Sequence, residues 1–172
     1  MATNEFFFPD IETVRIYIDM IHNQGMEVCR NRIDKEWLDG SLSKFSFGIA
    51  IYTNKAQIGQ SRKKKTDKYL KGFILCRIDN DSPYTVWIDL VCLTVMRSSA
   101  PKAQSRETSR VGTKLMQQAE EYTRSNKEIR VMMLYTLPEE PLKQWYRRHG
   151  FGVSNVDIWD GKTKAFLMTK FL

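Results

Sequence analysis

The segment YTVWIDLVCLTV, residues 84–95, constrains the fold more than any other part of the chain. It is rich in apolar and β-branched residues, which predicts a long strand near the centre of a sheet. The preceding run LKGFILCRI (70–78) and the turn DNDSP (79–83) predict that it closes an antiparallel hairpin. A helical pattern and a further apolar run (129–135) come next. A right-handed crossover would then place one parallel pair inside a mixed sheet.

Hydrophobic periodicity predicts the remaining elements. They are a short strand at 5–8, helices at 11–22 and 32–38, strands at 44–52, 70–78 and 84–95, a helix at 109–126, a strand at 129–135, a helix at 139–149, and strands at 151–159 and 164–171. We expect Asp10 and Ser109 to cap the first and third helices, and Gly150 to end the last. Ile11, Val14, Ile18 and Ile21 would form the apolar face of the first helix. The 172 residues therefore predict one α/β domain, with a mixed, mostly antiparallel sheet of six to seven strands flanked by about four helices.

The three cysteines, Cys29, Cys76 and Cys92, are far apart and lack both a CxxC pair and neighbouring histidines. This pattern predicts neither a disulfide framework nor a metal site, and it favours a reducing, cytoplasmic compartment. No stretch of about 20 residues is free of charge, so we expect no membrane partner and no spanning helix. The amino terminus has no signal-peptide pattern.

The net charge of +7 is concentrated in one segment. Residues 55–71 hold seven Lys or Arg and one acid, so they account for six of the seven net charges. We interpret this segment as a solvated hairpin tip. Two less favoured alternatives are a nucleic-acid contact through Arg62 to Lys65 and a nuclear address in RKKK.

A few polar residues stand out as candidates for chemistry. Asp89 interrupts the apolar run VWIDLV, so its carboxylate is either structurally paired or a proton acceptor. His22 and His149 each end a predicted helix, where a contact with the helix dipole is a sufficient explanation. Cys92 has no matched His and Asp partners, so buried packing explains it better than catalysis.

Three segments carry a resemblance to a known family. They are LTV (Leu93–Val95), SRVGTKLM (Ser109–Met116) and PLKQWYRRHGF (residues 141–151). Over roughly residues 45–172 the chain resembles the GNAT-type N-acetyltransferases, and the last segment is similar to their pattern around a tyrosine and a Gly-Phe pair. It departs from the family at Glu107 and Arg110, where Gln or Arg and Gly are usual, and the loop after Val95 is longer.

The resemblance implies the GNAT-type acyl-CoA N-acyltransferase fold, with acetyl-CoA as co-substrate and a primary amine as acceptor. It assigns the acetyl-CoA contacts to Leu93, Thr94, Val95, Ser109, Arg110, Val111, Gly112 and Thr113. In this family backbone N–H groups near the end of the central strand hold the thioester oxygen, and a helix start binds the phosphates. Gly112 would let a phosphate approach that helix start, or it would only allow close packing of helix and sheet.

The resemblance also implies that the hydroxyl of Tyr146 lies near the sulfur of CoA and stabilises the leaving thiolate. Packing at the edge of the core is the alternative for this side chain. Small amines, polyamines and protein amines all stay open as acceptors, as does the oligomeric state. The competing function is a non-catalytic domain that binds CoA or associates with nucleic acid.

Overall fold

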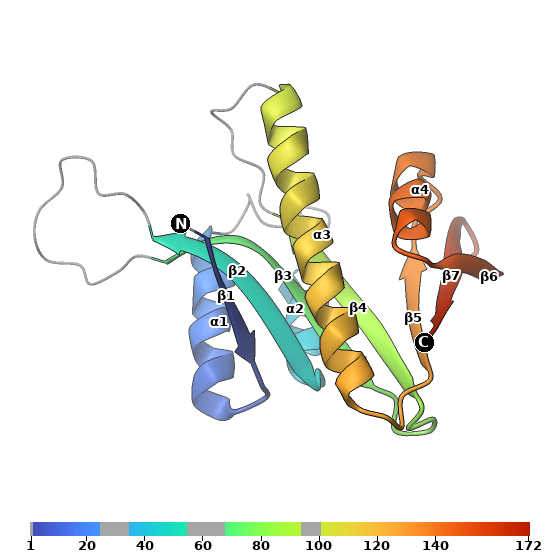
Figure 1. The fold of residues 1–172 in the computed structure, drawn as a ribbon, viewed down its shortest axis with the longest axis horizontal. Helices are drawn as coiled ribbons and strands as arrows, with labels where there is room; N and C mark the ends of the chain where they lie inside the picture. The colour runs from blue at the N-terminus through green and yellow to red at the C-terminus, as the bar shows by residue number, and fades with distance from the viewer. Residues whose placement is uncertain (1, 25–34, 55–67, 94–100) are drawn as a thin grey trace, which may run out of the picture.

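The computed structural model describes residues 2–24, 35–54, 68–93 and 101–172 (Figure 1). Its elements are β1 (Ala2–Phe7), α1 (Ile11–Gln24), α2 (Lys35–Leu42), β2 (Phe47–Asn54), β3 (Lys68–Ile78), β4 (Thr85–Leu93), α3 (Pro101–Ser125), β5 (Val131–Thr136), α4 (Glu140–Arg148), β6 (Gly152–Trp159) and β7 (Thr163–Phe171). Most of the basic segment, residues 55–67, lies outside the described residues.

Within the described residues, seven strands form a single sheet in the order β1-β2-β3-β4-β5-β7-β6. β4 and β5 are parallel, and every other neighbouring pair is antiparallel. Helix α3 connects the two parallel strands, as expected for a crossover connection. The predicted mixed, mostly antiparallel sheet with its central β4 is confirmed.

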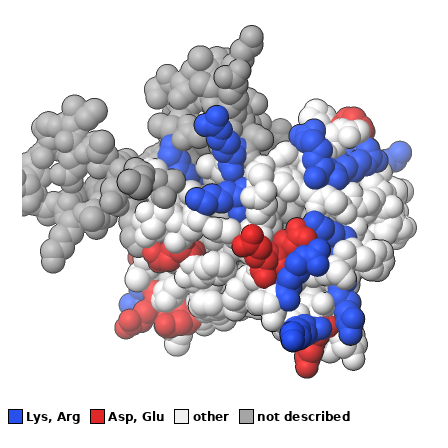
Figure 2. All heavy atoms as spheres, in the orientation of Figure 1, with Lys and Arg blue, Asp and Glu red and all other residues white. Residues whose placement is uncertain are grey.

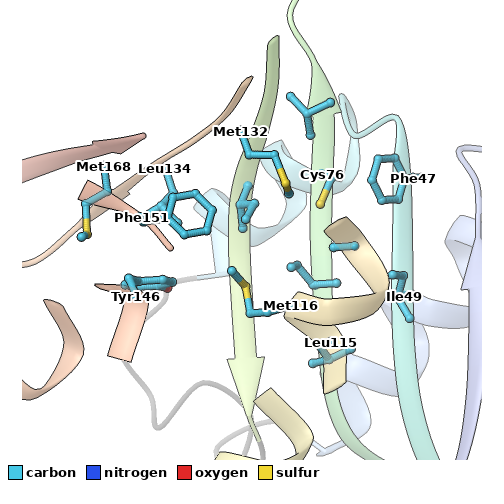
Figure 3. Close-up of a cluster of buried hydrophobic side chains, with 14 of the residues drawn as sticks. Phe47, Ile49, Cys76, Leu115, Met116, Met132, Leu134, Tyr146, Phe151 and Met168 are labelled. Carbon is cyan, nitrogen blue, oxygen red and sulfur yellow. The ribbon is translucent and has the colours of Figure 1, made fainter. Parts of the chain in front are cut away.

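Helices cover both faces of this sheet (Figure 1). On one face, Leu115 and Met116 of α3 and Tyr146 of α4 are buried against β2 to β5 (Figure 3). On the other face, Leu42 of α2 and Val14 of α1 pack on a second cluster that includes Phe73. Each fully buried large apolar side chain contributes about 1.5–3 kcal/mol relative to an exposed one. The two clusters hold the centre of the sheet between layers of helix.

Local sequence signals explain several element ends. The Asp10 carboxylate accepts a hydrogen bond from the Glu12 N–H at 3.1 Å, which confirms the predicted cap of α1. Gly150 follows α4 with a φ of +92°, a left-handed conformation that favours glycine. Asp160 and Gly161 have φ values of 51° and 67°, and they form the tight turn between β6 and β7.

Three expectations about the helices were wrong. α3 begins at Pro101, well before the expected start at Ser109. The reason is that the intervening residues include good helix formers such as Ala103 and Gln104, and proline is tolerated in a first helical turn. α2 extends to Leu42, past the predicted end at residue 38. Ile11 is 79% exposed and does not face the core.

Candidate active site

β4 and β5 pair only at their beginnings. Thr85–Trp87 lie opposite Val131–Met133, and beyond these residues the two strands diverge (Figure 1). From Ile88 onwards the edge of β4 that faces β5 therefore has no β5 residue paired with it. A free strand edge can accept an extended ligand as an additional strand.

A β-bulge at Asp89 accompanies the divergence. Leu75 of β3 lies opposite Leu90, whereas the next residue, Cys76, lies opposite Ile88, so Asp89 is an extra residue in β4. A bulge bends its strand and increases the local twist. It also reverses the side-chain alternation: Ile88 belongs to the cluster under α3, but Leu90 belongs to the cluster on the opposite face.

A cavity of about 670 Å³ lies between the diverging strands, a volume that is typical of ligand sites. Its lining comes from β3, β4, β5, α4 and β6 together with the residue that follows β5: Arg77, Trp87, Ile88, Asp89, Leu90, Val91, Leu134, Tyr135, Thr136, Leu137, Leu142, Tyr146 and Trp159. The cavity therefore brings together Asp89 and Tyr146, the two catalytic candidates expected from the sequence.

Tyr146 projects from α4 toward the β4 side of the cavity (Figure 3). Only 9% of the residue is exposed, and its ring is held by edge contacts with Trp145 and Phe151. Burial raises its pKa to about 12, so the phenol stays protonated at neutral pH. Its hydroxyl makes no hydrogen bond with any residue that the structure describes. The side chain therefore combines a fixed ring with a free donor.

Asp89 faces the cavity as part of an ion pair. Its two carboxylate oxygens accept hydrogen bonds from Nε and Nη2 of Arg77, at 2.9 and 3.2 Å. The side chains of Arg77 and Asp89 are 28% and 13% exposed, so both remain in contact with solvent. The structure thus contains the pairing that was one of the two explanations for this acid. Lone pairs that Arg77 does not use could still accept a proton through water.

At the level of sequence, no protein-family model and no curated protein matches the chain. Solved structures match over nearly its whole length. An acetyltransferase of the GNAT family from Desulfovibrio desulfuricans has a TM-score of 0.64 at 11% identity, over 99% of both chains. The chain has the GNAT fold.

Two further proteins, represented by three solved structures, have a similar fold. ElaA from Escherichia coli has a TM-score of 0.62 at 15% identity, over 99% of both chains. NAA60 from Arabidopsis thaliana, solved in complex with a bisubstrate analogue, has a TM-score of 0.58 at 14% identity, also over 99% of both chains. NAA60 has also been solved in complex with acetyl-CoA, with a TM-score of 0.59, 13% identity, and coverage of 100% of this chain and 99% of that chain. The resemblance seen in the sequence is confirmed at the level of the fold.

The segment expected to form the phosphate loop of the GNAT fold lies inside α3. Because α3 begins at Pro101, Gly112 is well inside the helix, and the expectation that a helix start lies there is wrong. A Cβ atom at Gly112 would lie 2.8 Å from Cζ2 of Trp145 and 3.2 Å from Cδ1 of Leu93. Gly112 therefore allows α3, α4 and β4 to pack closely, which is the alternative that the sequence left open.

The other expected acetyl-CoA contacts occupy different positions. Leu93 and Val111 are partly buried and pack against the cluster under α3, whereas Arg110 is exposed. Thr113 is half-buried on the same helix. Thr94, Val95 and the side chain of Ser109 lie outside the described residues. Of the described residues in this set, Leu93, Arg110, Gly112, Val111 and Thr113, none lines the cavity, so the role of the whole set in binding stays a prediction.

Sequence reasoning missed a row of aromatic rings in the cavity wall. Trp87 stacks on Tyr135 with centroids 5.8 Å apart, and Tyr135 lies 5.4 Å from Trp159 at a tilt of 57°. Trp87 stands two residues before Asp89, so its place near the opening could be inferred from strand alternation. Tyr135 and Trp159 join it only because β5 and β6 lie where the sheet order puts them, and no local pattern signals that.

Two minor expectations also require correction. Cys92 is disulfide-bonded, although no disulfide was expected. Burial, followed by the nearby Lys170 and Arg148, lowers the pKa of His149, so its imidazole is a poor cation for the α4 dipole. Instead Nζ of Lys170 donates a hydrogen bond to the His149 carbonyl at 2.7 Å.

The described residues contain neither a cluster suited to a metal ion nor a helix suited to a membrane. There, no group of three or more His, Cys, Asp and Glu side chains is placed to hold a metal ion. None of the described helices is both long enough and apolar enough to cross a membrane.

Proposed function

We propose that this chain transfers an acetyl group from acetyl-CoA to a primary amine by direct attack. The amine nitrogen forms a bond to the thioester carbon, the carbon–sulfur bond breaks, and the nitrogen loses a proton. One observation supports this proposal above the others: the edge of β4 that β5 leaves unpaired faces the same cavity as the Tyr146 hydroxyl, which has no hydrogen-bond partner among the described residues. The similar GNAT structure of NAA60 in complex with acetyl-CoA adds support.

The residues present fit an acetyl-CoA molecule. The pantetheine arm contains amide groups, which can pair with a free strand edge as another strand would. Residues 88–93 of β4 offer such an edge, and residues 88–91 line the same cavity as Tyr146. Backbone N–H groups there would stabilise negative charge on the carbonyl oxygen as the amine attacks.

Tyr146 is the proposed donor to the departing sulfur. A phenol with a pKa of about 12 is a weaker acid than a thiol of pKa about 8.5, so full proton transfer to the thiolate is uphill. A hydrogen bond to the developing thiolate is favourable because the hydroxyl has no competing partner among the described residues. Tyr146 would therefore act by stabilising charge, and a proton from water would complete the thiol.

Asp89 is the proposed proton acceptor. The amine must lose a proton before or during attack, because an ammonium nitrogen has no free lone pair. Arg77 occupies both Asp89 oxygens, so we favour transfer through a water molecule in the cavity over direct contact.

The phosphates of acetyl-CoA would lie along α3. The backbone N–H groups of residues 109–113 bond within that helix, so Ser109, Arg110 and Thr113 would contact phosphate through their side chains. Arg110 and Lys114 of α3 and Arg148 at the end of α4 are exposed. Figure 2 shows Lys and Arg side chains gathered over α3 and over α4 on this face. Such a basic surface favours an anionic co-substrate.

Acetyl-CoA turnover with a panel of amines tests this proposal. The purified chain is mixed with acetyl-CoA and a small amine, a diamine or a peptide, and release of the CoA thiol is followed together with the mass of the amine product. We expect thiol release that depends on the amine and yields an acetylated product. Binding of acetyl-CoA without turnover of any amine would contradict the proposed acetyltransferase activity and favour the non-catalytic alternative.

A further inference from the structure

The cavity opens toward both faces of the sheet. Tyr146 belongs to the buried cluster under α3, together with Met132 and Leu134 of β5. Side chains alternate along a strand, so Tyr135 points to the opposite face, and so does Trp87, which follows Val86 of the same cluster. Tyr146 and the aromatic row of Trp87, Tyr135 and Trp159 therefore lie at opposite ends of one cavity.

Carboxylates hold two of the three rings. The indole N–H of Trp87 donates to Oδ2 of Asp79 at 2.9 Å, and the hydroxyl of Tyr135 donates to Oδ2 of Asp157 at 2.9 Å. A hydrogen bond donated to an anion increases the electron density of the ring, and the anion adds negative potential beside it. Both effects favour a cation near these rings over a neutral or anionic group.

The remaining charges of the wall do not oppose a cation. Arg77 is the one Lys or Arg among the described residues that line the cavity, and its guanidinium is already paired with Asp89. Asp79 and Asp157, which accept hydrogen bonds from the edges of two of the rings, add two negative charges. The end of the cavity with the aromatic row is thus suited to a positively charged group with an aliphatic stem, which the rings can also cover.

We propose that the acceptor is an aliphatic diamine or polyamine, whose second ammonium group binds against Trp87, Tyr135 and Trp159 while its reactive amine reaches toward Tyr146. This inference rests on the proposed acetyl transfer. The group held by the rings cannot be the one that reacts, because carboxylates and ring faces stabilise the charged form, whereas attack needs a neutral amine. A fixed positive charge elsewhere in the same molecule also lowers the pKa of the reactive amine, which increases its neutral fraction.

The test compares 1,4-diaminobutane with 1-aminobutane, which has the same carbon chain and one charge fewer. We expect kcat/KM to be about tenfold or more higher for the diamine. Trp159→Leu is expected to reduce this ratio about 3- to 30-fold, mainly through KM, because the loss of one cation–π contact has an effect of this size. Trp159→Phe keeps a ring and is expected to retain more of the ratio. Ile158→Ala changes the exposed neighbouring residue on β6 and serves as the matched control.

A binding measurement separates this inference from the proposed function. Tryptophan fluorescence is titrated with 1,4-diaminobutane and with 1-aminobutane, with and without CoA. A saturable change for the diamine whose Kd rises in Trp159→Leu supports the inference. This holds even if no amine is acetylated, a result that would overturn the proposed function alone. Equal kcat/KM for the two amines in the native protein overturns the inference. The same Kd for the diamine in the native protein and in Trp159→Leu also overturns it.

Discussion

Asp89 and Tyr146 line one cavity, but the sequence signals that point to them differ in strength. Tyr146 lies on the short helix α4, and Gly150 and Phe151 of the same contiguous pattern come just after that helix, so neighbouring residues largely determine its position. The partner of Asp89 is Arg77, twelve residues away on the neighbouring strand. Sequence alone could recognise an acid in an apolar strand, but it could not show that the acid is paired.

Replacement of Asp89 by Asn tests its role in proton removal. We expect turnover to fall about 100-fold near neutral pH and less at higher pH, where more of the amine is already neutral. The measurement is kcat/KM as a function of pH, with Asp81→Asn, a change of an exposed acid in the turn before β4, as control. An equal loss at every pH would show that Asp89 positions Arg77 or the strand and does not accept the proton.

At the level of elements, the site depends on how β4, α3 and α4 meet. The bulge at Asp89 and the divergence from β5 create the opening, and α4 reaches it because Gly112 allows Trp145 to lie against α3. The order and type of elements follow from periodicity. The start of α3 does not, because the segment before Ser109 contains helix formers as well as polar loop residues, and a local pattern cannot decide between the two.

Gly112→Ala tests this contact between helices. The added methyl would lie 2.8 Å from the Trp145 ring, which edge contacts with Tyr146 and His149 hold in place. We expect the free energy of unfolding to fall by about 1–3 kcal/mol, as for other overpacked sites, and turnover to fall with it because Tyr146 moves. Denaturant unfolding provides the measurement.

Gly40→Ala is the matched control for this substitution. It places a methyl in helix α2, where no atom lies within 4 Å of the added Cβ, so no loss of stability is expected. If the Gly112→Ala protein is as stable as the native one, α3 and α4 leave room for a methyl group between Gly112 and Trp145.

At the scale of the whole molecule, Lys170 links three elements that are far apart in sequence. Its Nζ, on β7, donates hydrogen bonds to Oε2 of Glu120 on α3 and to the His149 carbonyl after α4, both at 2.7 Å. This arrangement depends on the strand order β5-β7-β6, which places the end of the chain beside the end of α4. No local sequence pattern predicts it, and the aromatic row is beyond local prediction for the same reason.

The pH dependence of stability tests the link through Lys170. Burial raises the pKa of Glu120, but hydrogen bonds from Lys170 and Arg124 lower it by more, so the net pKa is below its usual value. A lowered folded-state pKa stabilises the protein above the unfolded value, about 4.3, and this stabilisation is lost as pH falls through the folded value. Glu120→Gln is therefore expected to cost about 1–2 kcal/mol at neutral pH and to weaken the acid dependence.

The control for this variant is Glu121→Gln, which changes the exposed neighbour of Glu120 on the same helix. Urea unfolding between pH 3 and pH 7 gives the free energies for both variants. If Glu120→Gln and Glu121→Gln have the same pH profile, the ion pair with Lys170 contributes no net stability.

The Tyr146 hydroxyl is central to the proposed function, in which it stabilises the sulfur that leaves when acetyl-CoA reacts in the cavity between β4 and β5. Tyr146→Phe tests it most directly, because it keeps the ring that packs on Trp145 and Phe151 and removes only the oxygen. Turnover is measured under conditions where the chemical step limits the rate, with Tyr84→Phe, a change of an exposed tyrosine outside the cavity, as control. We predict that Tyr146→Phe lowers turnover about tenfold to a thousandfold, with acetyl-CoA affinity and Tm nearly unchanged. Native turnover in Tyr146→Phe would contradict the account and leave this tyrosine a packing residue.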